Sequence, residues 1–300
     1  MFKPIRLIPD NPNIPFLKLR MPALCLSAFL IIASLALCFT VGLNFGIDFK
    51  GGLVIEAKFK DAPDVTALRT ELNGLNLGQI TLQQVGADAS DVMFRIPQQT
   101  GGDAGNQTAI AAVRGHFGDR VAEYRRIEAV GPQVGGELIK TSIYAVLLSI
   151  GGTLSYLWFR FDRGFSIAAV VCLLHDVILT LGFFAILHLD FDLSTVAAVL
   201  LISGYSLNDT VVVFDRVREN MRKYRSKPFL EIAHLSLNET LFRTMMTSGT
   251  TLLVLVSLFV FGGEVIRNFT TALIFGIVIG TYSSIYVATP VWLLLEKKRA

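Results

Sequence analysis

The sequence predicts a polytopic α-helical membrane protein with six transmembrane helices and one small α+β domain between the first and second helices. Three observations predict this fold class. Hydrophobic residues make up 52% of the chain and charged residues only 17%, whereas soluble domains carry roughly 25% charged residues. The chain contains six long apolar segments. A stretch of about 90 residues between the first two segments has the mixed composition of a soluble domain.

Each apolar segment is long enough to cross a bilayer, because about 20 helical residues span roughly 30 Å of hydrocarbon. The first segment is interpreted as a retained helix, since it is too long for a signal-peptide core and no small-x-small cleavage site follows it. The segments lie at roughly 23–43, 141–159, 165–187, 195–213, 246–262 and 269–293.

The distribution of Lys and Arg predicts the orientation of these helices. Sixteen of them lie in the N-terminal segment, after the second and fourth apolar segments and in the C-terminal tail, whereas 188–194 and 262–268 contain only Arg267. Because positive charge stays on the cytoplasmic side, both termini are expected in the cytoplasm and segment 46–137 outside, which in a bacterium means the periplasm or the cell exterior. The basic run 216–227 is interpreted as a topology determinant and solvated loop; the alternative is a patch that binds nucleic acid or anionic membrane lipid. The predicted division is 1–22 cytoplasmic segment, 23–45 first helix, 46–137 periplasmic domain, and 138–300 the other five helices with the cytoplasmic C-terminus.

The pattern of residues 52–129 alternates between strands and helices. Their order, βαββαβ, is that of ferredoxin-like domains. No metal-ligand spacing or Ser–His–Asp arrangement is found here, and His116 is the only histidine, so neither an enzyme site nor a cofactor is expected. Cys25, Cys38 and Cys172 all lie in apolar segments, which excludes a disulfide framework and a cysteine zinc site. The expected elements are strand 52–59, helix 63–73, strands 79–85 and 91–96, helix 106–117 and strand 121–129.

Three ionisable residues fall inside or at the end of predicted membrane helices: Asp176, Asp209 and Arg243. Inserting a charged residue at the centre of a membrane helix costs about 2.5–3.5 kcal/mol, so each of these residues is expected to have a structural or functional role. A protonatable Asp209 facing the permanent charge of Arg243 could lose and regain a proton. Ser206, one turn before Asp209, and Asp176, next to His175, are weaker candidates for proton transfer. The alternative interpretation is a static buried ion pair, or an Asp209 close to the cytoplasmic headgroups.

The last apolar segment carries a small residue at every fourth position. Such a stripe allows close approach of another helix, whose identity the pattern leaves open. The stripe consists of Ala272, Gly276, Gly280, Ser284 and Ala288.

Five motifs resemble those of the SecD/SecF family of protein-export membrane subunits, in the same order and on the expected sides of the membrane. The segment 204–220 (GYSLNDTVVVFDRVREN) is similar to the SecF version of the family's fourth-helix motif. The other motifs are 46–52 (GIDFKGG), 131–138 (GPQVGGEL), 238–251 (NETLFRTMMTSGTT) and 275–284 (FGIVIGTYSS).

The resemblance implies a role that composition does not reveal. Members of this branch of the RND superfamily use the proton-motive force to help secreted proteins cross the inner membrane. They act with SecD, with YajC and with the SecYEG channel, on unfolded preprotein at the periplasmic side. By motif position, Asp209 and Arg243 match the family's proton-pathway residues. The remaining motif residues, expected to act as hinges at the membrane edge or as plain turns, are Gly46, Asp48, Gly51, Gly52, Gly131, Pro132 and Gly135.

Three other functions are alternatives to this one, and a feature of the sequence argues against each. An RND-type proton-coupled transporter of small molecules or lipids would normally carry two such halves in one chain. An intramembrane aspartyl protease built on Asp176 and Asp209 lacks the expected Gly-x-Gly-Asp motif, because Leu207 and Asn208 precede Asp209. A passive scaffold would not need buried charges.

Overall fold

The computed structural model describes residues 12–297, apart from 79, 86–89 and 263–265. Within these residues, six helical segments are long and apolar enough to cross a membrane, as predicted. The helix α1 follows a short 3-10 turn (Phe16–Leu19), and the last segment is divided into α9 and α10. The helices are α1 (Arg20–Thr40), α5 (Pro132–Arg160), α6 (Arg163–Leu187), α7 (Leu193–Lys223), α8 (Phe229–Phe261), α9 (Arg267–Ser283) and α10 (Thr289–Lys297).

Several helices are longer than the apolar segments that predicted them. The helix α8 begins at Phe229, although its apolar segment was placed at 246–262, and α5 begins at Pro132 and not near 141. The extra turns carry polar residues that a hydropathy window excludes. In α8, for example, Asn238 and Glu239 hydrogen-bond to neighbouring segments. Hydropathy therefore located the hydrocarbon-crossing part of each helix and not the helix ends.

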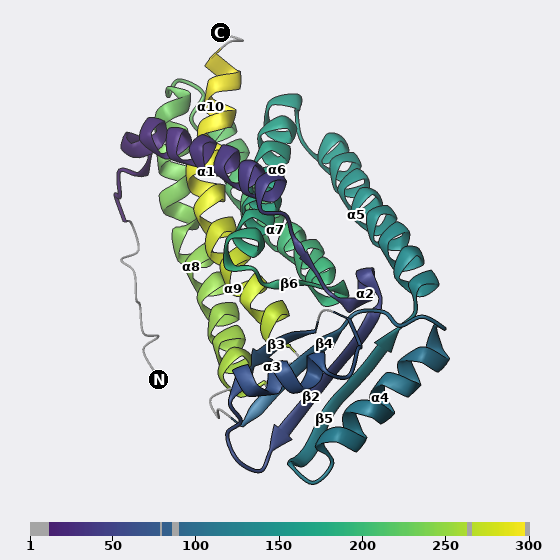
Figure 1. Cartoon of the computed structure of the whole chain (residues 1–300). Helices are drawn as coiled ribbons and strands as arrows, with labels where there is room; N and C mark the ends of the chain where they lie inside the picture. Colours follow the sequence, from purple (N-terminus) through teal and green to yellow (C-terminus); the bar gives the residue numbers. More distant parts are fainter. Residues whose placement is uncertain (1–11, 79, 86–89, 263–265, 298–300) are drawn as a thin grey trace, which may run out of the picture.

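The helices α6, α7 and α9 form the centre of the bundle, and α1, α5 and α8 lie at its periphery (Figure 1). Near the cytoplasmic end predicted for the bundle, Phe165 of α6 stacks on Trp292 of α10, with ring centroids 4.9 Å apart. The helix α5 stands apart along most of its length (Figure 1). Its Phe159 is 90% exposed, so this face of α5 is available to lipid or to another membrane protein.

The last membrane-spanning segment is not a continuous α-helix. A π-helical turn (Ser284–Ala288) separates α9 from α10. The Thr289 hydroxyl donates to the Ser284 carbonyl at 3.1 Å, which ties the end of this turn to its beginning. Such π-turns often occur at functional sites.

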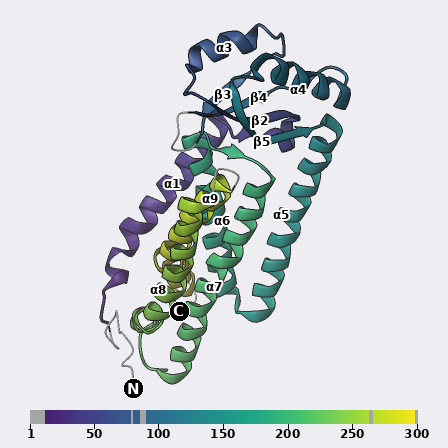
Figure 2. The same cartoon turned by 90° about the horizontal axis from the view of Figure 1, so that it is seen from below.

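Residues 52–130 form an α/β domain beyond one end of the bundle. Its four strands have the order β3-β4-β2-β5, with all neighbours antiparallel. Both helices cover the face of the sheet that is turned away from the long helices (Figure 2), and their apolar sides bury Leu68, Leu72, Val113 and Phe117 completely. The elements are β2 (Gly52–Phe59), α3 (Val65–Asn73), β3 (Thr81–Gln84), β4 (Asp91–Ile96), α4 (Asp103–Phe117) and β5 (Val121–Val130).

Three short elements that the sequence did not predict join this domain to the bundle. The strand β1 (Asn44–Phe45) pairs in parallel with β6 (Asp190–Phe191), which lies between α6 and α7. The single turn α2 (Ile47–Lys50) follows β1. Two-residue strands are too short to produce an alternating pattern, so only the tertiary structure reveals this pairing.

Candidate functional site

Two carboxylates are buried among the membrane helices: Asp176 on α6 is 0% exposed and Asp209 on α7 is 2% exposed. A buried carboxylate is tolerated only when donors or opposite charges replace its hydration. The neighbours of each carboxylate therefore indicate what each can do.

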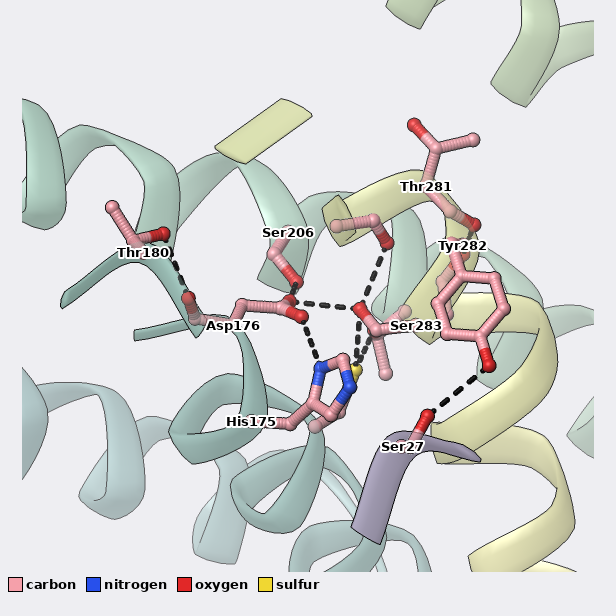
Figure 3. A network of polar contacts seen from close by, with 12 residues as sticks. Ser27, His175, Asp176, Thr180, Ser206, Thr281, Tyr282 and Ser283 are labelled. Atoms are coloured by element: carbon pink, nitrogen blue, oxygen red, sulfur yellow. Dashed lines mark hydrogen bonds and ion pairs between the residues drawn. The ribbon is translucent and has the colours of Figure 1, made fainter. Parts of the chain in front are cut away.

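Asp176 joins three central helices through its side chain (Figure 3). Its Oδ1 lies 2.8 Å from Nδ1 of His175 on the same helix. Its Oδ2 accepts hydrogen bonds from the hydroxyls of Ser206 on α7 and, at 2.8 Å, Ser283 on α9. Three donors thus surround this carboxylate in a region closed to solvent.

The close approach of α7 and α9 that brings these hydroxyls together depends on the small-residue stripe of α9. A Cβ atom at Gly280 would lie 3.0 Å from Cβ of Ser206, and a Cβ atom at Gly276 would lie 2.4 Å from the side chain of Ile202. The partner of the stripe, which the sequence left open, is therefore α7. Further along the stripe, the Ser284 side chain donates to the Thr281 carbonyl within its own helix.

A second layer of polar groups surrounds the Asp176 network. The Cys172 thiol donates to the Ser283 hydroxyl at 3.2 Å. The Tyr282 ring stacks against the His175 ring, with centroids 6.3 Å apart, and its hydroxyl lies 3.1 Å from Ser27 of α1 (Figure 3). Nε2 of His175 is buried and has no hydrogen-bond partner among the described residues.

Asp209 has a sparser environment. Its Oδ2 lies 3.4 Å from the Ser248 hydroxyl on α8, a long contact for a hydrogen bond between oxygens. Ser248 is in turn 2.8 Å from the Thr281 hydroxyl on α9. Asp209 therefore contacts α8 directly and α9 through one intervening hydroxyl.

The structure does not bring Arg243 into an ion pair with Asp209. Arg243 is exposed on α8, and no salt bridge joins it to a carboxylate in the described part of the chain. Arg243 precedes Ser248 by five residues in α8. It therefore lies about 7.5 Å nearer the start of the helix than Ser248 and about 140° around the helix axis from it. Ser206, which the sequence associated with Asp209, bonds to Asp176.

The first glycine motif contacts the start of α7. The Gly46 amide donates to the Phe191 carbonyl at 2.9 Å, and the Asp48 carboxylate accepts from the Leu193 amide at 2.9 Å. A Cβ atom at Gly46 would lie 3.2 Å from Cβ of Asp192, the residue that caps α7. The chain leaving α1 is thus hydrogen-bonded to the beginning of the helix that carries Asp209.

The other glycines of the two motifs lie where β2 begins and where α5 packs against α2. Gly52 has φ +124° and a Cβ there would lie 2.6 Å from the Ile96 carbonyl oxygen, so glycine is required at this position. Gly51 precedes it with φ +74°. In α5, which begins at Pro132 after the N-cap Gly131, a Cβ at Gly135 would lie 3.0 Å from the Phe49 carbonyl oxygen.

An ion pair that the sequence analysis missed connects the sheet to the bundle. Arg95 of β4 pairs with Asp190, which also accepts a hydrogen bond from Asn44 at 2.7 Å. The pair borders a cavity of about 60 Å³ that also contains Asp192. Burial lowers the pKa of the Arg95 guanidinium, and the negative charge of Asp192 partly opposes this shift. No sequence signal could have paired residues 95 positions apart.

The described residues contain no group of three or more His, Cys, Asp or Glu side chains that could hold a metal ion. The polar chemistry of the site therefore consists of carboxylates, hydroxyls, one imidazole and one thiol. Groups of this kind can bind, release and pass on protons.

Comparison with known proteins identifies the family of the chain. The family model described as "Protein export membrane protein SecD/SecF, C-terminal" matches residues 110–298, and "SecD/SecF GG Motif" matches residues 36–63. "Protein translocase subunit SecF" of Cereibacter sphaeroides is 45% identical over 302 residues, covering 98% of this chain and 93% of that protein. The protein of the same name from Rickettsia akari is 41% identical over 297 residues, covering 99% of this chain and 96% of that protein.

Two solved structures are also similar. The crystal structure of SecDF from Thermus thermophilus has a TM-score of 0.87 and 33% identity, covering 99% of this chain and 40% of that chain. SecDF in a super-membrane-facing form has a TM-score of 0.70 and 32% identity, with 100% and 40% coverage. The chain thus spans about two fifths of the SecDF chains it resembles.

Proposed function

The chain belongs to the SecD/SecF family of protein-export membrane proteins and acts in protein export as a SecF-type subunit, and we propose that it does so by using the proton-motive force. The observation that carries this proposal is the buried Asp209 of α7, which has one weak hydrogen bond and no ion pair among the described residues. A buried carboxylate with so few donors needs either a proton or a new partner charge, so a change in its protonation can be coupled to a movement of the helices.

We infer that Asp209 alternates between two arrangements. In one, it contacts Ser248, as seen here. In the other, the ionised carboxylate pairs with Arg243, which requires α8 to move along or rotate against α7. One charge crossing the membrane yields about 2.3 kcal/mol per 100 mV. That energy is comparable with the cost of exchanging a weak hydrogen bond for a solvated ion pair. Asp176 and Ser206 are weaker candidates for proton transfer, and they lie in a separate network that does not bond to Asp209.

Movement of α7 would reach the α/β domain through its first residues. Asp48 and Gly46 bond directly to the segment that precedes and caps α7, and Arg95 pairs with Asp190 in the same segment. We propose that these contacts, with the glycine motifs as hinges, transmit the displacement of α7 to the domain. The domain would then hold or release the emerging polypeptide.

We further propose that the α/β domain is ferredoxin-like and periplasmic, and that both termini are cytoplasmic. The βαββαβ order and the strand order β3-β4-β2-β5 support the first part. The excess of Lys and Arg on the opposite side of the helices supports the second. The same division assigns 1–22 to the cytoplasm, 23–45 to the first helix, 46–137 to the periplasmic domain and 138–300 to the other helices.

The proposed partners are SecD, YajC, the SecYEG channel and unfolded preprotein on the periplasmic side. The likeness to two fifths of a SecDF chain supports SecD, because the remainder of that chain would correspond to a second subunit here. The exposed apolar face of α5 offers a surface for a neighbouring membrane protein.

The test is gradient-driven export with the Asp209→Asn variant, in vesicles that also contain the SecD partner. Asn cannot ionise, so we expect the stimulation of export by a proton gradient to be lost while ATP-driven export continues. Asp215→Asn is the matched control, because Asp215 lies six residues further along α7, has a side chain that is 41% exposed and is paired with Arg160. Full stimulation with Asp209→Asn would refute the proposal.

A further inference from the structure

We propose that His175 and Asp176 form a second proton-binding site among the membrane helices, in which the imidazole and the carboxylate together hold one transferable proton. This inference rests on the proposed function, because a second site matters only if protons move through the bundle. It concerns a network that is separate from Asp209 and that does not include Arg243.

The charge balance of the network is the first argument. Asp176 is 0% exposed, and so is His175. The titratable groups that the structure places in or beside this network are Cys172 on α6 and Tyr282 on α9, with Asp209 three residues beyond Ser206 on α7; α1 contributes the Ser27 hydroxyl and the Ala23 carbonyl, both bonded to Tyr282. None of these groups is a cation. Burying an isolated ionised carboxylate has a large desolvation free energy. Binding one proton makes the pair of His175 and Asp176 neutral overall and therefore stabilises it.

The hydrogen bonds around Asp176 indicate where that proton resides. Oδ2 accepts two hydroxyl hydrogen bonds, from Ser206 and Ser283, and such bonds favour the ionised carboxylate. The proton is then held by the His175 ring, as an imidazolium whose Nδ1–H donates to Oδ1 at 2.8 Å. The loaded state is imidazolium with carboxylate, and loss of one proton leaves neutral imidazole with carboxylate.

The unpartnered Nε2 of His175 is the atom through which the proton enters and leaves. In the loaded state Nε2–H lacks an acceptor among the described residues, and in the unloaded state its lone pair lacks a donor. Such an unsatisfied buried atom is unfavourable in both states, so a water molecule that reaches Nε2 would be stabilised there. A water molecule reaching this edge of the ring would receive the proton as Nε2–H breaks, and would return it by the reverse step.

The location of the pair suggests how its charge could affect the helices that Asp209 contacts. On α7, Ser206 lies three residues before Asp209; on α9, Thr281 and Ser283 are two residues apart, one in each network. Ser283 also directly precedes the π-turn. Unloading His175 would leave a net negative charge that only neutral donors stabilise, namely Nδ1–H of His175 and the two serine hydroxyls, which would tighten α6 onto α7 and α9.

The charge state of His175 can be read directly by nitrogen-15 solid-state NMR of the chain with its SecD partner in lipid. The chain contains four histidines, and the signal lost in His175→Gln identifies this one. We expect an imidazolium signal near about pH 7, which becomes that of a neutral ring in Asp176→Asn. A neutral His175 ring beside an ionised Asp176 from about pH 5 to about pH 9 would overturn the proposal.

Measurements of export test whether this proton-binding site contributes to function. With His175→Gln, we expect the pH profile of gradient-driven export to flatten and its rate to fall. Ser283→Ala is the matched control, because it removes one hydrogen bond to Asp176 and keeps both titratable groups. It should lower the rate and shift the pH profile without flattening it. An unchanged profile in His175→Gln would contradict the inference. If a variant fails to assemble, the NMR signal of the native chain still decides the question.

The two proposals can fail independently. If Asp209→Asn exports normally, the proposed function is wrong, whereas the His175 signal would still report whether the pair binds a proton. If Asp209→Asn abolishes coupling and His175 is neutral throughout, only the second site is refuted.

Discussion

The close contact between α7 and α9 predicts a measurable difference between two glycine-to-alanine substitutions. A Cβ atom at Gly276 would lie 2.4 Å from Cδ1 and Cγ1 of Ile202 and 2.8 Å from its Cγ2. Carbon atoms prefer separations of about 3.5–4.0 Å, so the helices would have to move apart by roughly 1 Å. At Gly204 on α7, by contrast, a Cβ atom would meet nothing within 4 Å.

The magnitude follows from comparing the two sites. Both substitutions replace glycine in a helix, which favours alanine by about 1 kcal/mol. Overpacking a well-packed contact costs about 1–3 kcal/mol. The helix preference cancels in the comparison, so Gly276→Ala should be less stable than Gly204→Ala by about 1–3 kcal/mol. Adding Ile202→Ala to Gly276→Ala removes all three clashing atoms and should give a favourable coupling energy between the two changes.

The assay is the unfolding of the purified protein in lipid, followed by melting temperature and by denaturant titration. The double-mutant cycle over Gly276 and Ile202 supplies the coupling energy. Equal stability of Gly276→Ala and Gly204→Ala, or additive effects in the cycle, would refute the packing argument.

Two further predictions concern the α/β domain. Arg95→Met should leave the half-buried Asp190 without its cation and weaken docking of the domain on the helices by about 1–3 kcal/mol. The weaker docking would be measured as faster hydrogen exchange in β4 and β6. Arg120→Met is the control, because it removes a more exposed ion pair and should not accelerate exchange in these strands. Phe117→Ala should destabilise the domain by about 3–5 kcal/mol, because this fully buried ring stacks on Phe94 with centroids 6.0 Å apart. Limited proteolysis of the domain would detect that loss, and native-like resistance would contradict the assigned core.

The sequence by itself determined the long helices and the main strands of this protein, but not the short elements β1, α2 and β6. Long apolar runs are local properties of the chain, and they were sufficient to locate six membrane helices. The strand at 52–59 and the strand at 91–96 were also predicted with the bounds seen in β2 and β4, because alternation and turn residues are local too. The helix ends differed most, as in α8, because polar turns outside the hydrocarbon carry no hydropathy signal.

Only the tertiary structure decided which side chains meet. The spacing of Ser206 and Asp209 indicated one shared face, yet Ser206 bonds to Asp176 of another helix while Asp209 contacts Ser248. Such contacts depend on the rotation and axial position of each helix relative to its neighbours, and a shift of 100° or 1.5 Å per residue changes every partner. Arg95 and Asp190 likewise meet because two separately folded parts dock together, which no local pattern in the chain describes.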